Sequence, residues 1–142
     1  MAAAPFDWTQ YLRLATDLSR NADEASQRTV ISRAYYSIFH AATLQAKPNG
    51  YAERSHGRLW KMYQADTDRN AKKLSALGHV MKRAREDADY VTQVPRVNEI
   101  MAQQLTDANR FIAILAQVPA SSPQPLPPPP TRNCPNCGAL QP

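Results

Sequence analysis

Residues 1–118 contain no cysteine and only three prolines. Both cysteines and nine of the 12 prolines lie between Pro119 and Pro142. Two cysteines separated by two residues give no framework for a disulfide-stapled fold, and a segment so rich in proline builds no core of its own. The sequence therefore predicts a folded part at residues 1–118, a Pro-rich linker at 119–133 and a short C-terminal tail at 134–142.

The sequence also lacks a long apolar run and a recognisable export signal. No stretch of about 18 apolar residues occurs, so no membrane-spanning helix is expected. The first eight residues carry neither the basic segment nor the apolar segment that is typical of secretion. We therefore expect a cytoplasmic protein without a membrane partner.

Strand patterns are nearly absent, and apolar residues instead recur at the spacings of three and four that are typical of helices. Asp7 is expected to cap a first helix, and Asn21 or Asp23 a second one, which runs to about Ala46 and stops at residues 47–50. The second helix carries a heptad seam whose small central residues allow a neighbouring helix to approach closely. The members of this seam are Val30, Ala34, Ser37, Ala41 and Leu44.

Two further helical segments complete the expected fold. One starts at Ser55, is broken near residues 66–68 and is weakened later by Gly78. The other has Pro95 in its first turn, where proline is tolerated, is marked by apolar residues from Val97 to Leu115 and ends before Pro119. The sequence thus predicts an all-α fold, a four-helix bundle whose third helix is in one or two pieces.

Positive charge is concentrated in one part of the chain. The net charge is +5, and the stretch from Arg54 to Arg85 holds nine Lys or Arg against two acidic residues. Such a stretch attracts a polyanion such as RNA, or it is an ordinary solvated helix face. The candidate RNA-binding residues are Arg54, Arg58, Lys61, Lys72 and Lys73.

Arg33 and His40 are the candidate catalytic residues. They are seven positions apart, so on a helix they project from nearly the same face, about 10 Å apart along the axis. A guanidinium in this place can hold phosphate oxygens, and an imidazole can act as general acid or base. RNA supplies its own nucleophile, the 2′-hydroxyl, so this chemistry needs no metal. In the alternative interpretation, His40 bonds within the bundle and Arg33 pairs with an acidic residue.

The sequence around these two residues, SRAYYSIFHAA at 32–42, resembles the signature of the HEPN superfamily, the "higher eukaryotes and prokaryotes nucleotide-binding" domain. The resemblance is to the branch with an Arg-x-Tyr-Tyr-x-x-Phe-His pattern. Residues 55–57 (SHG) and 85–90 (REDADY) fit the same pattern, so the resemblance covers about residues 7–117. It implies a helical bundle that forms a homodimer, in which an Arg-x6-His motif from each protomer faces a shared cleft.

The resemblance further implies a metal-independent endoribonuclease of toxin or defence type. Arg33 would bind the phosphate, and His40 would be the acid or base. Tyr36 and Ser37, which lie between them, are accessory candidates, as is His56. A cognate nucleotidyltransferase would act as the antitoxin. The alternative is a non-catalytic nucleotide- or protein-binding HEPN module that works with a nucleotidyltransferase or another defence protein.

His56 and Tyr90 each have two interpretations. His56 follows Ser55 at a helix start, where backbone N–H groups favour anions, so it either joins the cleft as a second imidazole or is an exposed residue of the first turn. Tyr90 either packs its ring while Asp89 pairs with Arg85, or is modified by the partner nucleotidyltransferase.

Cys134 and Cys137 resemble one knuckle of a zinc ribbon. Two thiolates at this spacing chelate tetrahedral zinc, which needs four ligands in all. We therefore expect a structural zinc whose remaining ligands come from the second tail of a dimer, from a partner or from a bundle histidine. The alternative is a free dithiol. No cofactor is expected for catalysis.

Overall fold

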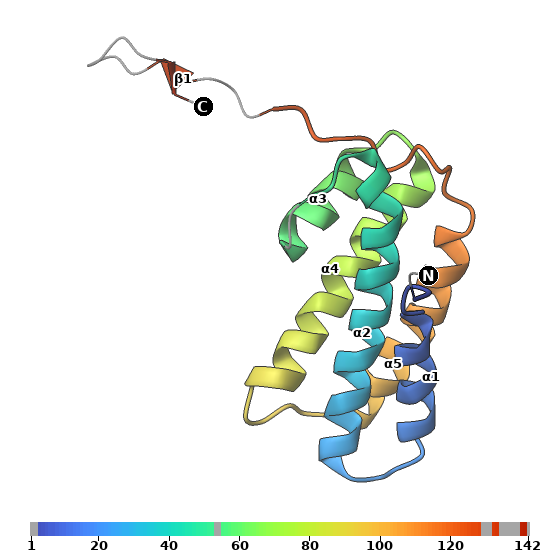
Figure 1. The fold of residues 1–142 in the computed structure, drawn as a ribbon. Coiled ribbons are helices and arrows are strands. Elements are labelled where there is room, and N and C mark those ends of the chain that lie inside the picture. Colours follow the sequence, from blue (N-terminus) through green and yellow to red (C-terminus); the bar gives the residue numbers. More distant parts are fainter. Residues whose placement is uncertain (1–2, 53–54, 129–131, 134–139, 142) are drawn as a thin grey trace.

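The computed structural model describes residues 3–52, 55–128, 132–133 and 140–141 (Figure 1). The prediction of an all-α protein is confirmed, because the regular secondary structure of the described residues is helical apart from two paired two-residue strands. The elements are α1 (Thr9–Leu18), α2 (Glu24–Ala46), the short 3-10 helix η1 (Lys47–Asn49), α3 (His56–Ala65), α4 (Arg69–Tyr90), α5 (Val97–Leu115), β1 (Arg132–Asn133) and β2 (Leu140–Gln141). None of the described helices has the length and apolar character needed to cross a membrane.

Polar side chains set the starts of four helices. Asp7, Asp23 and Ser55 each accept a hydrogen bond from a backbone N–H in the first turn of α1, α2 and α3, at 3.0, 2.9 and 3.3 Å. Asp68 does the same for α4 at 2.9 Å. These caps satisfy donors that a helix start otherwise leaves unpaired. Gly50, in the left-handed region with φ 101°, ends the turn that follows α2.

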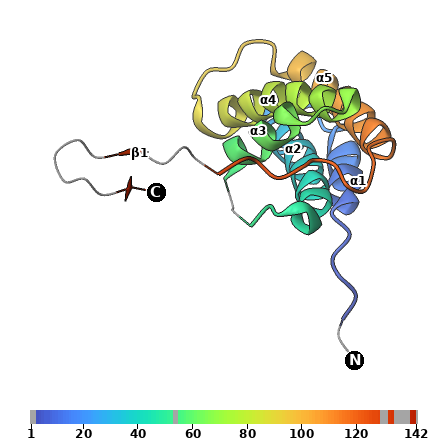
Figure 2. The same ribbon diagram turned by 90° about the horizontal axis from the view of Figure 1, so that it is seen from above.

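The long helix α2 runs through the centre of the bundle. It packs against α1, α4 and α5, while α4 also packs on α5 and α3 packs on α4 (Figure 1). The break between α3 and α4 falls at the predicted residues 66–68, so the expected third helix is in two pieces. Seen from above, the chain that follows α5 crosses the end of the bundle (Figure 2).

The seam predicted on α2 is correct only in its first half. Val30, Ala34 and Ser37 are fully buried, but Leu44 is 52 % exposed. A straight helix has 3.6 residues per turn and drifts away from a strict seven-residue repeat. Because of this drift, Ala42 and Ala46 lie in the core near the end of α2, and Leu44 does not.

Gly78 makes the close approach of α3 and α4 possible. A Cβ atom at this position would lie 2.5 Å from the Trp60 ring, which is shorter than any real contact of that kind. Trp60 is fully buried, and its carbonyl accepts a hydrogen bond from Ser75 Oγ at 2.8 Å. The glycine that the sequence marks as a weak point of the helix is therefore required by packing.

Residues 119–126, here named the strap, lie against the end of the bundle. The buried carboxylate of Asp66 accepts hydrogen bonds from Ser122 Oγ at 3.2 Å and from the Gln124 N–H at 2.7 Å. Pro123 is fully buried. The first part of the proline-rich segment thus packs on the folded part of the chain.

Candidate functional site

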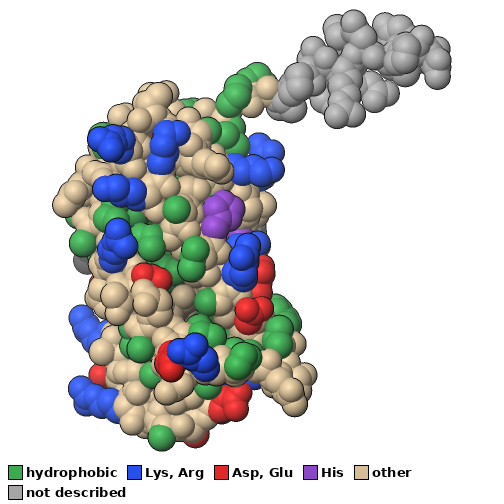
Figure 3. Space-filling model, turned by 180° about the vertical axis from the view of Figure 1, so that it is seen from behind, with side chains coloured by type: hydrophobic (Ala, Val, Ile, Leu, Met, Phe, Trp, Pro, Cys, Tyr) green, Lys and Arg blue, Asp and Glu red, His purple; other side chains and the backbone are tan. Residues whose placement is uncertain are grey.

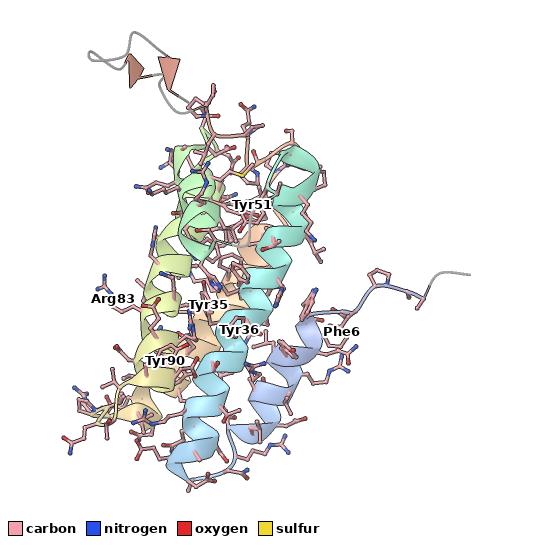
Figure 4. The ribbon with its side chains drawn as sticks, turned by 60° about the vertical axis from the view of Figure 1, so that its left-hand side comes forward. Phe6, Tyr35, Tyr36, Tyr51, Arg83 and Tyr90 are labelled. Atoms are coloured by element: carbon pink, nitrogen blue, oxygen red, sulfur yellow. The ribbon has the colours of Figure 1, made fainter. Side chains whose placement is uncertain are left out.

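The ring of Tyr36 on α2 lies among four basic side chains. The guanidinium carbons of Arg33 and Arg85 are 5.1 and 5.5 Å from its centroid, and the imidazole centroids of His40 and His56 are 6.1 and 6.0 Å away. Figure 4 shows Tyr36, with Tyr35, on the bundle's central helix. The site therefore contains two pairs, Arg33 with His40 and Arg85 with His56, which share one tyrosine.

Arg33 is half-buried between two aromatic rings. Its guanidinium carbon is 5.0 Å from the Tyr11 centroid and 5.1 Å from that of Tyr36. Contacts of this kind use the faces of the rings and leave the N–H donors of the arginine available. Within the described residues no carboxylate forms an ion pair with Arg33, so the alternative in which an acid neutralises it is wrong.

His40 is half-buried beneath the N-terminal segment. The Trp8 ring stacks on its imidazole with centroids 3.6 Å apart. Burial lowers the pKa of His40, and the positive charges of Arg33 and Lys47 lower it further. The lowered pKa favours the neutral form of His40 at pH 7, which is the form that a general base needs.

His56 is held by a hydrogen bond and by a stacked ring. Its Nδ1 lies 2.7 Å from the Tyr35 hydroxyl, and its ring stacks on Phe39 with centroids 3.9 Å apart. Burial lowers the pKa of His56, and the charge of Arg85 adds to this effect. The interpretation of His56 as an exposed first-turn residue is wrong, although Ser55 does cap the helix as expected.

Arg85 does not belong to the basic surface that its stretch of sequence suggests. The residue is only 7 % exposed, and its guanidinium lies 5.4 Å from the Tyr35 centroid. Carboxylate oxygens of Glu86 and Asp89 approach it at 3.9 and 3.8 Å, and its Nε has no partner within the described residues. Its position on α4 turns it inward, towards the aromatic side chains of α2.

The other basic candidates lie on the surface. Arg58 and Lys61 are exposed on α3, and Lys72 and Lys73 are exposed at the start of α4. Arg54 lies outside the described residues. In the rear view, Lys and Arg side chains predominate near the end from which the C-terminal segment leaves, and acidic side chains lie lower down (Figure 3).

A pocket of about 560 Å³ opens beside His40. Both imidazoles line it, together with Lys47 and the rings of Trp8, Phe39 and Tyr51; Arg33 does not. Sequence patterns could not identify Lys47, Trp8 or Tyr51 as pocket residues, because the three come from separate segments.

Burial and exposure correct two predictions, that of Ser37 as an accessory site residue and that of Tyr90 as a packed ring. Ser37 is fully buried and its Oγ donates to the Ala34 carbonyl at 2.8 Å, so it offers nothing to a ligand. Tyr90 is 79 % exposed, so its expected packing is wrong, while the expected pair of Arg85 and Asp89 is present.

The zinc prediction stays a prediction. Cys134 and Cys137 lie outside the described residues. In the part of the chain that the structure describes, no three His, Cys, Asp or Glu side chains come together as a metal site.

In comparisons with known proteins, no family model, no curated protein and no solved structure matches the chain. The function is therefore inferred from the two Arg and His pairs around Tyr36 and from the pocket beside them.

Proposed function

We propose that this protein is a HEPN-type endoribonuclease of toxin or defence type that cleaves RNA without a metal ion. One observation supports this most directly. Arg33 keeps its N–H donors free of any described carboxylate, and a neutral imidazole, His40, shares the Tyr36 ring with it. An anion-binding group beside a base is the minimum that cleavage by the 2′-hydroxyl requires.

The chemistry follows from these two side chains. Arg33 donates hydrogen bonds to the non-bridging oxygens of a phosphodiester. Neutral His40 accepts the proton of the 2′-hydroxyl, and the 2′-oxygen forms a bond to phosphorus. The bond from phosphorus to the 5′-oxygen breaks, and that oxygen takes up a proton from solvent. The products are a 2′,3′-cyclic phosphate and a 5′-hydroxyl.

A homodimer and basic steering residues are part of the proposal. The exposed side chains of Arg58, Lys61, Lys72 and Lys73 would attract RNA through long-range charge. The homodimer is what the resemblance to the HEPN superfamily implies, with one motif from each protomer facing a shared cleft.

The function is tested by expressing the wild type and His40→Ala in a bacterial host. We expect growth arrest and fragmented RNA with the wild type only. His79→Ala, which changes an exposed histidine on α4, is the matched control and should behave as the wild type. Intact RNA with the wild type, in cells and with the purified dimer, would contradict the proposal.

A non-catalytic nucleotide-binding module is the second candidate. It is favoured by the Trp8 ring, which covers one face of His40, and by the absence of Arg33 from the lining of the pocket. This candidate predicts that the purified protein binds nucleotides and cleaves no RNA. Tyr90, at 79 % exposure, would be accessible to a nucleotidyltransferase partner in either case.

For the tail, we propose a structural zinc bound by Cys134 and Cys137. Since zinc takes four ligands, two tails of a homodimer would share one ion. Metal analysis should then give about one zinc per two chains. No zinc after purification under reducing, chelator-free conditions would contradict this.

A further inference from the structure

A chain of hydrogen bonds leads from the core to His56. The Trp60 Nε1–H donates to the Tyr35 hydroxyl oxygen at 3.2 Å, and that hydroxyl lies 2.7 Å from His56 Nδ1. Trp60 and Tyr35 are fully buried, so no water competes for these groups. An indole nitrogen only donates, and a tyrosine hydroxyl has one proton to give.

This chain fixes the tautomer of His56. Burial raises the pKa of Tyr35, so its hydroxyl keeps its proton. The hydroxyl oxygen accepts from Trp60, and among the described residues His56 Nδ1 is the partner that can accept the hydroxyl proton. A proton on Nδ1 would leave the buried hydroxyl proton without an acceptor, which is costly. His56 is thus a neutral imidazole with its proton on Nε2.

The fixed proton is on the ring nitrogen that remains for a ligand. His56 lines the pocket and its Nδ1 is bonded to Tyr35, which leaves Nε2 as the nitrogen that can bind a molecule there. Phe39 stacks on the ring and prevents it from rotating. The ammonium of Lys47 belongs to the same lining, and its positive charge makes the pocket suited to an anion.

Aromatic rings make up much of the remaining wall. Trp8, Phe39 and Tyr51 line the pocket, and its volume of about 560 Å³ lies in the range of small-molecule sites. Flat apolar rings with two polar donors suit a ligand that has a planar base and a phosphate group.

We propose that this pocket binds a phosphorylated nucleoside, and that His56 donates a hydrogen bond from Nε2 to its phosphate while Lys47 neutralises the charge. The inference rests on the proposed function, because it assigns to the pocket the nucleotide next to the phosphodiester whose 2′-hydroxyl neighbour gives its proton to His40. A neutral imidazole is too weak an acid to release a proton, so His56 binds and orients the phosphate.

The tautomer is tested first, without any activity. Long-range ¹H–¹⁵N spectra of the full-length protein labelled at histidine nitrogen should show His56 as the Nε2–H form. Tyr35→Phe removes the donor and should give a mixture of tautomers. Tyr63→Phe is the matched control, since it removes a buried hydroxyl bonded to the Ala42 carbonyl in the same core. A mixed tautomer in the wild type would overturn the assignment.

Binding is tested with a 2′-deoxy dinucleotide that carries a 5′-phosphate and cannot be cleaved by the proposed chemistry. His56→Leu should weaken binding about tenfold, as expected for the loss of one hydrogen bond to a charged group. His56→Gln should restore most of the affinity, because the amide can accept from Tyr35 and donate into the pocket. Equal binding by wild type and His56→Leu would overturn the proposal.

The source of the phosphate is distinguished by a second titration. Stronger binding of the dinucleotide than of AMP would identify an RNA strand as the ligand, and the reverse would identify a free nucleotide. Shifts of the His56 signals without RNA cleavage would support the inference and contradict the ribonuclease. RNA cleavage with unchanged His56 signals would support the ribonuclease and contradict the inference.

Discussion

The two pairs around Tyr36 contain the same residue types but differ in what surrounds them. Arg33 and His40 lie on one helix, half-buried, with aromatic rings as their only described close partners. Arg85 and His56 come from two other helices; Arg85 is 7 % exposed, and His56 is fixed by a hydrogen bond to Tyr35.

The difference shows which groups can still respond to a ligand. Arg33 retains donors for an anion, whereas the guanidinium of Arg85 is enclosed by the core and serves the packing of α4 on α2. Conversely, His56 presents one defined proton, because its other nitrogen is already bonded. Arg33, His40 and the second ring nitrogen of His56 can therefore still bind a ligand, whereas Arg85 cannot.

The largest expected effect separates the two arginines. Arg33→Ala should lower the rate of RNA cleavage about 10²- to 10⁴-fold and change the free energy of unfolding by no more than about 1 kcal/mol. Arg85→Ala should instead lower that free energy by about 1–3 kcal/mol, because it empties a buried space beside Tyr35. Cleavage assays and urea unfolding of both variants check this, and equal stability of the two would contradict the comparison.

A smaller effect is expected on the packed side of the site. Gly78→Ala forces a methyl group into the Trp60 ring and should lower the free energy of unfolding by about 1–3 kcal/mol, despite the better helix propensity of alanine. Gly57→Ala is the control, because among the described residues its Cβ meets only Ser55 Oγ, at 4.0 Å. Urea unfolding measures both, and a stable Gly78→Ala would show that α3 is free to move away.

Acid should weaken the fold through both histidines. Their pKa values in the folded protein lie below the ordinary value of 6.5, so folding favours their neutral forms. The resulting stability is present above pH 6.5 and is lost as the pH falls through the lowered pKa values. Urea unfolding as a function of pH should show this loss, and His40→Gln with His56→Gln should make the curve flatter.

The smallest effect concerns the pKa values themselves. Arg33→Met should raise the pKa of His40 and leave that of His56 nearly unchanged, since Arg33 acts only on the nearer imidazole. Arg85→Met should raise the pKa of His56 and leave that of His40 nearly unchanged. Lys82, Glu86 and His40 also act on His56: Lys82 and His40 lower its pKa, Glu86 raises it, and all three are retained in these variants. NMR titration of the two histidines checks the prediction, and a common response would mean that the pairs are coupled.

Local signals made the helices predictable. Caps such as Asp7, Asp23 and Ser55 act within three residues, and the predicted break at 66–68 also depends on neighbouring residues. The same locality placed Arg33 and His40 on one side of one helix.

Long-range packing explains what the sequence could not show. Arg85 looks like one more basic residue of a surface helix, and its inward position depends on Tyr35, 50 positions earlier in the chain. Trp8 reaches His40 only because α1 packs on α2. Neither contact can be predicted from the spacing of neighbouring residues.

The strap has a consequence for how the protein can be divided. A chain cut after residue 118 would remove the two donors that Ser122 and Gln124 give to the buried carboxylate of Asp66. It would also uncover the surface on which Pro123 is buried. The smallest fragment suitable for expression, crystallisation or grafting onto another protein therefore extends to residue 126, well into the proline-rich segment.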